Sequence, residues 1–468
     1  MMKEDTICAV STPVGEGGIG VVRLSGPASH GLLRAVFRPR KRVRALASHR
    51  LYLGFIFDPD TGADVDEVFA VLMRPPRTYT REAMAEVYTH GGPAAQKAVI
   101  GLFTRLGARL AEPGEFTRRA FENGRIDLAQ AESVLDIIQS ETAEELASAL
   151  AHVKGALSGR LSAAKSAITA LLAEVEAEID FPDEELDEPG AATEARGEHP
   201  ARLSRIDAVR SDIAALAATY EEGRAVTRGV DVLIAGKRNV GKSSLLNALV
   251  GSDRAIVTPI PGTTRDLVED RLRINGIKFI LTDTAGLGAP ADAIEQEGMD
   301  RVRKKMAEAD IVLWVLDASR PYTDEDGEAW TTAAGKTVIA VLNKSDLPPA
   351  AGPDEPAAAV AARDVRSVAT CALDGSGIDA LKGTLYGVFT ARGHKGAALL
   401  VTNVRHRDAL LATDAALARA SACADREDRA ELYAFELRDA LFHLGVITGE
   451  TAAEEVLAEI FSRFCIGK

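Results

Sequence analysis

The spacing of hydrophobic and polar positions divides the chain into segments of different character. The first segment, residues 1–122, contains short apolar runs separated by Gly and Pro, such as RLYLGFIFD at residues 50–58 and VDEVFAVLMRP at residues 65–75. Short, partly alternating runs bounded by turn residues are typical of β-strands. We therefore predict a compact α+β domain over residues 1–122.

A helical pattern begins at about residue 123. Residues 126–181 are nearly free of Pro, rich in Ala, Leu and Glu, and apolar at spacings of three and four. This spacing gathers the apolar side chains on one face of a helix. An acidic break follows at residues 182–192, and helical patterning then continues to about residue 224. The pattern predicts long amphipathic helices over residues 123–225.

The pattern changes again over residues 226–390. Apolar strands alternate with helical stretches there, at residues 229–236, 278–286, 310–319 and 336–346. Fully apolar strands that alternate with helices indicate a parallel sheet covered on both faces. Helical patterning resumes over residues 391–468. We predict a multidomain α/β and α+β protein in which a P-loop α/β domain is inserted into a helical domain.

Composition agrees with a multidomain globular protein. A length of 468 residues corresponds to about three domains of ~150 residues, and 46% hydrophobic content is ordinary for packed cores. We find neither a signal peptide nor an apolar run of about 18 residues, so we predict a cytoplasmic protein without membrane contact. The four cysteines, Cys8, Cys371, Cys423 and Cys465, are scattered, which favours reduced thiols over disulfides or a zinc site.

The net charge of −14 disfavours non-specific binding to nucleic acid, which needs clustered Lys and Arg. One segment differs from the chain as a whole. Residues 37–44 (FRPRKRVR), with Arg34 and Arg50 nearby, form a dense basic patch. Two interpretations remain for this patch, a solvated loop or a contact with RNA phosphates.

Residues 236–244 (GKRNVGKSS) follow a predicted strand and precede a predicted helix. They match G-x-x-x-x-G-K-[ST] in the strand–loop–helix context of a phosphate-binding loop. In such a loop backbone N–H groups surround the phosphates at the helix N-terminus. We expect Lys242 to bind the β- and γ-phosphates and Ser243 to ligate Mg²⁺.

Further motifs follow in the order of a GTP site. PGTTRD supplies Thr264 as a second Mg²⁺ ligand, DTAG supplies Asp283, and NKSD supplies Asp346. The Asp346 carboxylate can accept hydrogen bonds from the guanine N–H edge, which adenine lacks, so we predict GTP. Cys371 is interpreted as a packing residue in the last base-contacting loop. The predicted GTP-binding residues are Asn239, Val240, Gly241, Lys242, Ser243, Ser244, Thr258, Pro259, Ile260, Pro261, Gly262, Thr263, Thr264, Asp283, Thr284, Ala285, Gly286, Asn343, Lys344 and Asp346.

Leu287 follows DTAG, where many GTPases have a Gln that orients the attacking water. Glu295 is a candidate to orient that water instead, and its alternative is an exposed helix carboxylate. A monovalent cation such as K⁺ can replace the charge of an arginine finger. Oxygen ligands for K⁺ are available at Asn239, Thr258, Ile260 and Thr263.

Over essentially its whole length, the sequence resembles the MnmE (TrmE) family of tRNA-modification GTPases. The resemblance rests on these motifs and on TPVGEGGIGVVRLSG (residues 12–26), THGGP (89–93), EPGEFTRRAFENGRIDLAQAE (112–132), DFPDEE (180–185), DAIEQEG (292–298), ITGE (447–450) and FCIGK (464–468). The domains it implies are a folate-binding and dimerisation domain (1–122), a helical domain in two parts (123–225 and 391–468) and an inserted G domain (226–390).

The resemblance also implies cofactors and partners. The N-terminal domain would form a homodimer and bind 5-formyltetrahydrofolate through Arg23, Glu86, Arg125 and Lys468. The G domains of the dimer would close in the presence of K⁺, with Glu295 as the catalytic acid. With an FAD-dependent partner of the MnmG/GidA type, the enzyme would form an aminomethyl or carboxymethylaminomethyl group on the wobble uridine of tRNA. Arg125 stands where Lys is more usual in the family.

Two other functions would account for part of these features. A ribosome-assembly GTPase would share the Leu after DTAG, but such proteins usually add a KH or similar RNA-binding module, which we do not find. A folate-dependent one-carbon transferase would not need an intact G domain. The two ends of the chain favour the tRNA-modification enzyme.

The cysteine four places from the end has three interpretations: a prenylation box, a buried inert thiol, or a reactive group. Lys468 at the last position disfavours prenylation. We predict that Cys465 lies near the folate site, where Lys468 and Arg23 would favour its thiolate. It would then be catalytic in tRNA modification, with no part in GTP hydrolysis.

Overall fold

The computed structural model describes residues 5–13, 15–180, 191–251, 269–283, 304–352, 355–391, 399–423 and 430–468. The chain forms two compact units. Unit 1 comprises residues 1–139, 149–214 and 408–468, and unit 2 comprises residues 140–148 and 215–407. The finer boundaries at residues 122, 225 and 390 stay a prediction.

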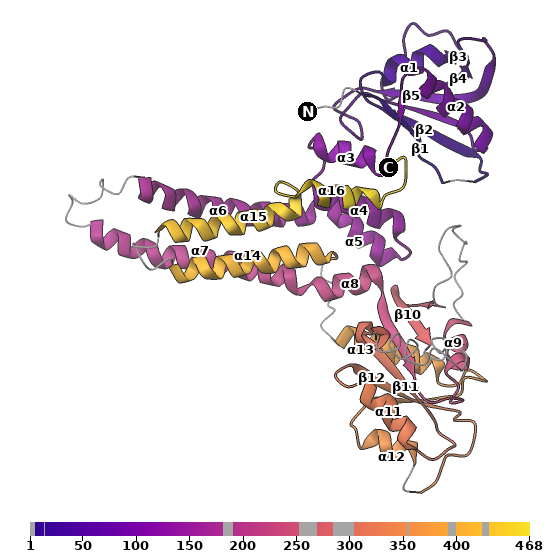
Figure 1. Cartoon of the computed structure of the whole chain (residues 1–468), viewed down its shortest axis with the longest axis vertical. Coiled ribbons are helices and arrows are strands. Elements are labelled where there is room, and N and C mark those ends of the chain that lie inside the picture. Colours follow the sequence, from indigo (N-terminus) through magenta and orange to yellow (C-terminus); the bar gives the residue numbers. More distant parts are fainter. Residues whose placement is uncertain are drawn as a thin grey trace, which may run out of the picture. The chain divides into compact units, whose positions relative to one another are not determined.

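Unit 1 begins with a mixed α+β region (Figure 1). Its elements are β1 (Ile7–Val10), β2 (Ile19–Ser25), α1 (Ser29–Val36), β3 (Phe37–Pro39), β4 (Tyr52–Phe57), β5 (Asp64–Met73), β6 (Met84–His90), α2 (Pro93–Arg105) and β7 (Arg109–Leu110). The strands form one sheet in the order β3-β4-β5-β6-β2-β1-β7. Val22 and Leu24 of β2 and their neighbour Val87 of β6 are buried on one face of this sheet.

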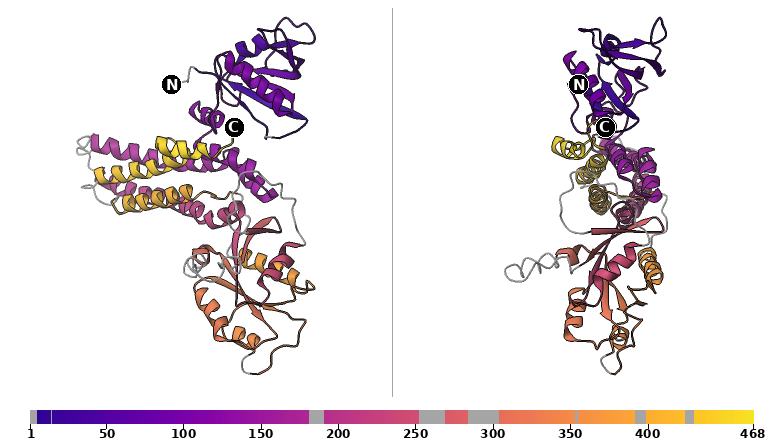
Figure 2. Two further views of the ribbon diagram at one scale, coloured as in Figure 1. Left: turned by 45° about the vertical axis from the view of Figure 1, so that its right-hand side comes forward. Right: turned by 90° about the vertical axis from the view of Figure 1, so that its right-hand side faces the viewer.

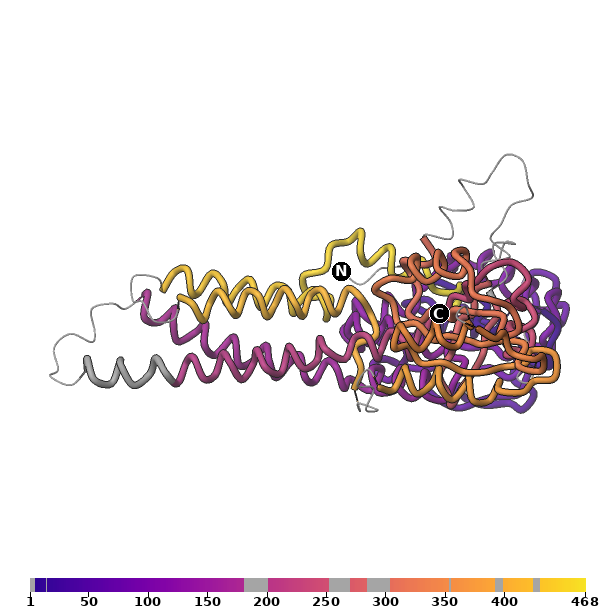
Figure 3. Tube along the Cα trace, turned by 90° about the horizontal axis from the view of Figure 1, so that it is seen from below, coloured from indigo at the N-terminus to yellow at the C-terminus, as the bar shows by residue number. Residues whose placement is uncertain are grey.

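The rest of unit 1 is helical. Its helices are α3 (Glu115–Glu122), α4 (Leu128–Gln139), α5 (Ala143–Val153), α6 (Ala156–Asp180), α7 (Ala191–Ala218), α14 (Val404–Cys423), α15 (Ala430–Thr448) and α16 (Glu454–Ser462), of which α5, α7 and α14 extend into unit 2. Figure 2 and Figure 3 show the long helices α6, α7, α14 and α15 side by side. The buried residues of α6 recur at spacings of three and four, as the amphipathic pattern predicted.

Unit 2 contains a six-stranded sheet in the order β13-β12-β11-β8-β10-β9. Its elements are α8 (Tyr220–Arg228), β8 (Val230–Ala235), α9 (Lys242–Gly251), β9 (Glu269–Ile274), β10 (Ile277–Asp283), β11 (Ile311–Asp317), α11 (Asp324–Thr332), β12 (Thr337–Asn343), α12 (Pro356–Ala361), β13 (Ser367–Thr370) and α13 (Ile378–Ala391). All pairs are parallel except β9 with β10. The predicted fold class is confirmed.

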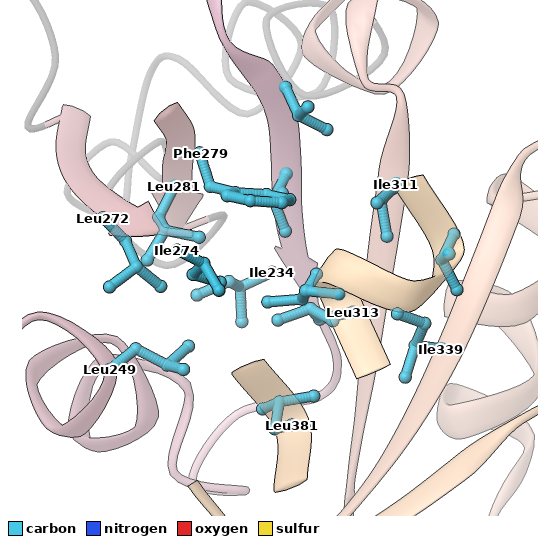
Figure 4. Packing of buried hydrophobic residues seen from close by; sticks show 14 of the residues in the cluster. Ile234, Leu249, Leu272, Ile274, Phe279, Leu281, Ile311, Leu313, Ile339 and Leu381 are labelled. Atoms are coloured by element: carbon cyan, nitrogen blue, oxygen red, sulfur yellow. The ribbon is translucent and has the colours of Figure 1, made fainter. Parts of the chain in front are cut away.

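The core of unit 2 explains why its strands are continuously apolar. Leu313 of β11, Ile234 of β8 and Phe279 of β10 pack against Leu249 of α9 and Leu381 of α13 (Figure 4). Every residue of β11 is buried, because helices cover both faces of the sheet. The carboxyl ends of the parallel strands therefore form the edge at which loops can hold a ligand.

The sequence interpretation missed the hairpin that adds β9 to this sheet. Asn275 and Gly276 have φ values of 47° and 81°, and they join β9 to β10 as a two-residue turn. Asn-Gly between alternating apolar residues is a strong hairpin signal. The signal was present in the sequence.

The N-terminal end of α5 belongs to unit 2 through a cluster of charges. Glu141 pairs with Arg271 at 2.7 Å and with Arg273 at 3.0 Å, and the buried Lys278 lies 3.4 Å from Glu145. These contacts hold residues 140–148 against the β9–β10 hairpin. Among the described residues, no helix is long and apolar enough to cross a membrane.

Candidate functional site

The predicted phosphate-binding loop connects β8 to α9. Gly241 has φ +97°, and a Cβ atom at this position would lie 2.3 Å from Nδ2 of Asn343. A side chain here would therefore be strained in its backbone and would collide with the Asn343 side chain at the end of β12. Asn239 also has a left-handed conformation, with φ 63°. The loop therefore turns tightly, through two left-handed residues, just before α9 begins.

Lys242 stands at the first position of α9, inside this loop. Its Nζ donates hydrogen bonds to the carbonyl oxygens of Gly236 and Lys237, each at 2.8 Å. Burial lowers the pKa of Lys242, and Arg238 adds to this, whereas Asp283 acts in the opposite direction. A partly desolvated ammonium at the start of a helix can pair with an anion such as a phosphate group.

The next residue meets the end of β10. Ser243 Oγ donates a hydrogen bond of 2.6 Å to Oδ2 of Asp283. A hydroxyl and a carboxylate are hard oxygen ligands of the kind that Mg²⁺ prefers. Within the described residues, no three His, Cys, Asp or Glu side chains form a complete metal cage. Mg²⁺ with few protein ligands is common in sites where the substrate phosphates supply the others.

Asn343, at the end of β12, joins three parts of the site. Its Nδ2 donates to the carbonyl oxygen of Val240 at 2.8 Å. Its Oδ1 accepts from the backbone N–H of Ala372 and from the hydroxyl of Thr370, both at 3.2 Å. Asn343 is buried, so these bonds replace its contacts with water.

Lys344 follows with a left-handed backbone, and its side chain links the loop before α9 to the end of β11. Its Nζ donates to the carbonyl oxygen of Asn239 at 2.9 Å and to Oδ2 of Asp317 at 2.7 Å. Burial alone would raise the pKa of Asp317. The hydrogen bonds from Lys344 and Ser319 outweigh burial, so the pKa of Asp317 lies below its ordinary value. The sequence interpretation did not include Asp317. The signal that could have revealed it is an acidic residue at the end of an apolar strand.

Asp346 and Cys371 belong to the two segments that are predicted to contact the base. Asp346 is exposed, and Cys371 is buried beside it. The pKa of Cys371 is raised: a backbone hydrogen bond at Asp374 lowers it, but burial and a side-chain hydrogen bond to Asp346 raise it. A neutral thiol next to the carboxylate agrees with a packing role for Cys371.

Several predicted residues lie outside the described residues. They are Thr258, Pro259, Ile260, Pro261, Gly262, Thr263, Thr264, Thr284, Ala285, Gly286, Leu287 and Glu295. Of the predicted K⁺ ligands, the structure therefore describes Asn239. Of the predicted Mg²⁺ ligands it describes Ser243.

A second cluster lies in unit 1, on the face of the sheet opposite α1 and α2. Arg23 of β2 and Glu86 of β6 are register partners, and Nε of Arg23 donates to Oε1 of Glu86 at 2.8 Å. The hydroxyl of Tyr88 donates to Oε2 of Glu86 at 2.7 Å. Burial and the Glu86 carboxylate raise the pKa of Tyr88 to about 12. Tyr88 was not predicted, but it lies two residues from Glu86 and therefore on the same face.

The C-terminal tail docks beside this cluster. Ile466 forms an antiparallel bridge with Pro113, and the carbonyl oxygen of Gly467 accepts from Ser11 at 2.9 Å and from Nη1 of Arg23 at 3.4 Å. The pKa of Lys468 is lowered by burial and then by Arg23, whereas Cys465 and Glu86 act to raise it. Phe461 and Phe464 are buried behind the tail.

Tyr79 brings Arg125 into the same cluster. The guanidinium carbon of Arg125 lies 4.6 Å from the centre of the Tyr79 ring, and that of Arg23 lies 5.6 Å from it. All four predicted folate residues therefore gather within unit 1, together with Tyr79 and Tyr88. Arg125 also borders a cavity of about 550 Å³ lined by α3, α6, α15 and the start of α4, which Arg23, Glu86 and Lys468 do not line.

Cys465 itself is exposed. The interpretation of this residue as a buried inert thiol is wrong, because its neighbours Phe461 and Phe464 turn into the core and leave Cys465 at the surface. Its chemical role stays a prediction.

Comparison with known proteins gives a consistent result over both units. The profile described as the TrmE N-terminus of GTP-binding proteins matches residues 6–125, and the profile of the MnmE helical domain matches residues 128–465. Proteins named tRNA modification GTPase MnmE from Geobacter metallireducens and Geobacter sulfurreducens are 44% and 45% identical, over 100% of this chain and 100% of each relative.

Among solved structures, the G domain of the FeoB iron transporter of T. maritima is 26% identical and covers 34% of this chain and 97% of that chain, with a TM-score of 0.26. The matches to the two family profiles, together with the full-length relatives, identify the family. The chain belongs to the MnmE (TrmE) family.

Proposed function

We propose that this chain hydrolyses GTP and uses that hydrolysis, with a reduced folate and an FAD-dependent partner of the MnmG/GidA type, to modify the wobble uridine of tRNA. The product would carry an aminomethyl or carboxymethylaminomethyl group at carbon 5 of the uridine. The coarse function, a GTPase of tRNA modification, follows from membership of the family. The observation that carries the finer proposal is that one chain contains both a GTP site and the tail-docked cluster of Arg23, Glu86, Arg125 and Lys468.

The GTPase part is assigned residue by residue. Lys242 would bind the β- and γ-phosphates, and Asp346 would accept hydrogen bonds from the guanine edge. Ser243 would ligate Mg²⁺ with Thr264, and Asp283 would support the site from the end of β10. Mg²⁺, when bound, neutralises phosphate charge. The hydrogen bond between Ser243 and Asp283 supports this assignment, because it places two hard oxygen donors together.

Water and charge need further groups, since Leu287 cannot orient water. We assign the orientation of water to Glu295 and a K⁺ site to Asn239, Thr258, Ile260 and Thr263. K⁺ supplies the positive charge that an arginine finger supplies elsewhere. Loss of one such charge typically lowers kcat by ~10²–10³. GTP turnover should therefore fall steeply when Na⁺ replaces K⁺, and equal rates in the two salts would contradict the K⁺ site.

The folate part is assigned to unit 1. The guanidinium groups of Arg23 and Arg125 suit carboxylate groups, and Glu86 can accept hydrogen bonds from N–H donors of a pterin. Lys468 adds a cation, and an anionic ligand would oppose the effects of burial and of Arg23, which lower the pKa of Lys468. The Tyr79 ring, which both guanidinium groups approach, offers a flat surface beside them.

The sheet of unit 1 supports a homodimer. Leu53, Phe69, Tyr88 and Val21 are register partners on adjacent strands, and they form one row across the face opposite α1 and α2. Leu53 is 37% exposed and Phe69 is 48% exposed. An apolar row on a sheet face is a surface that a second copy would bury. A cytoplasmic location belongs to the proposal as well, because tRNA is the substrate.

The two parts are separated by one experiment on a Cys465→Ser variant. We expect normal GTP turnover by the purified protein and loss of the wobble-uridine modification in a deletion strain that carries the variant, measured by mass spectrometry of tRNA nucleosides. Ser462→Ala, at an exposed position of α16 just before the tail, is the matched control and should retain both activities. Normal modification by Cys465→Ser would remove Cys465 from the chemistry.

The deletion strain also tests the function as a whole. An unchanged wobble uridine would favour a ribosome-assembly GTPase or a separate one-carbon transferase. Calorimetry with 5-formyltetrahydrofolate tests the cofactor, because Glu86→Ala should abolish the heat that the wild type releases. The proposed folate site fails if the wild type releases no heat or if the variant binds equally well.

A further inference from the structure

The distribution of charge in unit 1 is uneven. Residues 17–57 contain seven Arg, one Lys and no Asp or Glu, although the chain as a whole has a net charge of −14. Most of these cations lie in β3 and in the loop of residues 40–51 between β3 and β4. The GTP site and the folate cluster use none of the residues in this loop.

The loop is held in place by backbone and side-chain contacts. The backbone N–H of His49 donates to the carbonyl oxygen of Leu72 at 2.9 Å, and the N–H of Ala47 donates to the hydroxyl of Tyr52 at 2.9 Å. Leu46 is buried and anchors the middle of the loop. The charged residues on either side of Leu46 are exposed, whereas Leu46 itself is buried.

Two further contacts bring a second basic segment to the loop. The N–H of Arg74 donates to Oγ of Ser48 at 2.9 Å, and Nε2 of His49 lies 2.6 Å from the carbonyl oxygen of Arg77. Both arginine side chains are exposed. We define the basic surface as the exposed side chains of Lys41, Arg42, Arg44, Arg50, Arg74 and Arg77.

Two arginines close to the basic surface, Arg38 and Arg40, are neutralised by acidic residues, whereas no described acidic residue neutralises the cations of the basic surface. Arg38 pairs with Asp64 at 2.5 Å, and Arg40 pairs with Glu67 at 3.0 Å, both on β5. None of the six side chains of the basic surface forms an ion pair with an acidic residue that the structure describes. Arg50 instead lies over the ring of Tyr52, at 5.6 Å from its centre. Six cations thus remain on one surface of a strongly acidic protein.

We propose that the basic surface binds the phosphate backbone of RNA. The proposal rests on the proposed function, in which tRNA is the substrate, and it assigns to these residues the contact with the tRNA backbone. Five of the six cations are arginines, whose planar fork binds phosphate through two parallel hydrogen bonds. An interface with a protein would concentrate apolar side chains and lack charge at its centre. The exposed large apolar side chains of the loop, Val43 and Leu51, are instead separated by charged residues.

Counterion release makes the proposal quantitative. Each phosphate neutralised by a protein cation contributes roughly 0.7 to 0.9 to the slope of log K against log salt. Removal of three cations should therefore reduce that slope by about two to three and weaken binding at least ~10-fold at moderate salt. Phosphate contacts carry no sequence information, so their removal should weaken the binding of all tRNA sequences equally.

The test uses the full chain and an unmodified tRNA transcript in a fluorescence anisotropy titration between 50 and 200 mM KCl, a range that resolves the slope. The variant is Lys41→Ala/Arg42→Ala/Arg44→Ala. The matched control, Lys97→Ala/Lys154→Ala/Arg366→Ala, removes the same charge at exposed positions elsewhere. We expect the first variant to show the reduced slope and affinity, the control to resemble the wild type, and GTP turnover to be unchanged in both.

Three results would overturn the inference. They are an absence of tRNA binding by the wild type, equal affinities and slopes for the wild type and the basic-surface variant, and an equal loss in the control. If the basic-surface variant binds tRNA normally but loses an acidic protein partner, the surface is a protein interface and the RNA assignment is wrong. The nucleoside profile of the deletion strain tests the function separately, so a wild-type slope in the variant would leave the proposed function intact.

Discussion

At the scale of single residues, the GTP site depends on side chains that join separate loops. Asn343 contacts the phosphate-binding loop at Val240 and the base-contacting loop at Ala372. Lys344 contacts the phosphate-binding loop at Asn239 and also binds Asp317. Asn343 and Lys344 of the NKSD motif therefore brace the two loops that are predicted to contact the nucleotide.

This leads to a prediction for Asn343→Ala. The substitution leaves the buried carbonyl of Val240 and the N–H of Ala372 without their partner, and each unsatisfied group costs about 1–3 kcal/mol. We expect GTP affinity to fall by roughly one to two orders of magnitude, as measured by titration with a fluorescent GTP analogue. Thr370→Val removes one hydrogen bond of 3.2 Å and is the control, with a much smaller loss expected. Equal affinities for Asn343→Ala and the wild type would show that the bracing is unimportant.

At the scale of elements, the tail is a short segment whose position depends on one glycine. Gly467 has φ +93°, and a Cβ atom there would lie 2.2 Å from the carbonyl oxygen of Val10. An alanine would therefore be strained in its backbone and would collide with the end of β1. The carbonyl oxygen of Gly467 also accepts the hydrogen bonds from Ser11 and Arg23 that fix the tail.

We predict that Gly467→Ala displaces the tail and weakens binding of 5-formyltetrahydrofolate by at least ~10-fold, equivalent to about 1.4 kcal/mol. The physical reason is that Lys468 would no longer face Arg23 and Glu86. Calorimetry measures the affinity, and GTP turnover should stay at the wild-type rate. Gly101→Ala in α2 is the matched control, because nothing lies within 4 Å of the added Cβ atom. Unchanged folate affinity in Gly467→Ala would show that the position of the tail does not contribute to folate binding.

At the scale of the whole molecule, unit 1 contains a buried network of charges. Arg119 is 1% exposed and pairs with Glu115 at 3.0 Å, Asp5 at 2.7 Å and Glu82 at 3.3 Å. Burial alone would raise the pKa of Glu115. Hydrogen bonds from Arg109, Glu112 and Arg119 outweigh burial, so the pKa of Glu115 lies below its ordinary value of 4.5. The pKa of Asp5 is lowered in the same way, by Arg109 and Arg119 against its burial.

The sign of the pH dependence follows from these shifts. A carboxyl group with a lowered pKa in the folded state stabilises the fold above its ordinary pKa and loses this contribution as the pH falls through its folded pKa. We therefore expect the free energy of unfolding of unit 1 to be steady near neutral pH and to decrease below about pH 4.5. Urea unfolding followed by circular dichroism at several pH values measures this decrease.

The two tryptophans give this experiment its control. Trp314 and Trp330 both lie in unit 2, so tryptophan fluorescence follows that unit while circular dichroism follows both. Glu115→Gln should flatten the acid dependence of the transition in unit 1 and leave the fluorescence transition unchanged. An unaltered acid dependence in both signals would assign the effect to other carboxylates.

The sequence by itself determined the fold class, the order of the elements and the GTP motifs. Each of these is encoded by neighbouring residues, since periodicity sets the local structure and the phosphate-binding loop occupies nine consecutive positions, residues 236–244. The Asn275-Gly276 hairpin was encoded in the same local way and was overlooked. The family resemblance indicated which residues would bind folate, but not how those residues are arranged in space.

Only the tertiary structure placed Gly467 against Arg23, across 444 positions of sequence, and brought Tyr79 and Tyr88 to the same cluster. It also joined Asp317 to Lys344 and held Arg74 and Arg77 beside the basic loop. Such contacts leave no period or spacing in the sequence, because they depend on how strands pair and where the chain end docks. The exposure of Cys465 has the same cause: its neighbours are anchored by packing against residues that are distant in the chain.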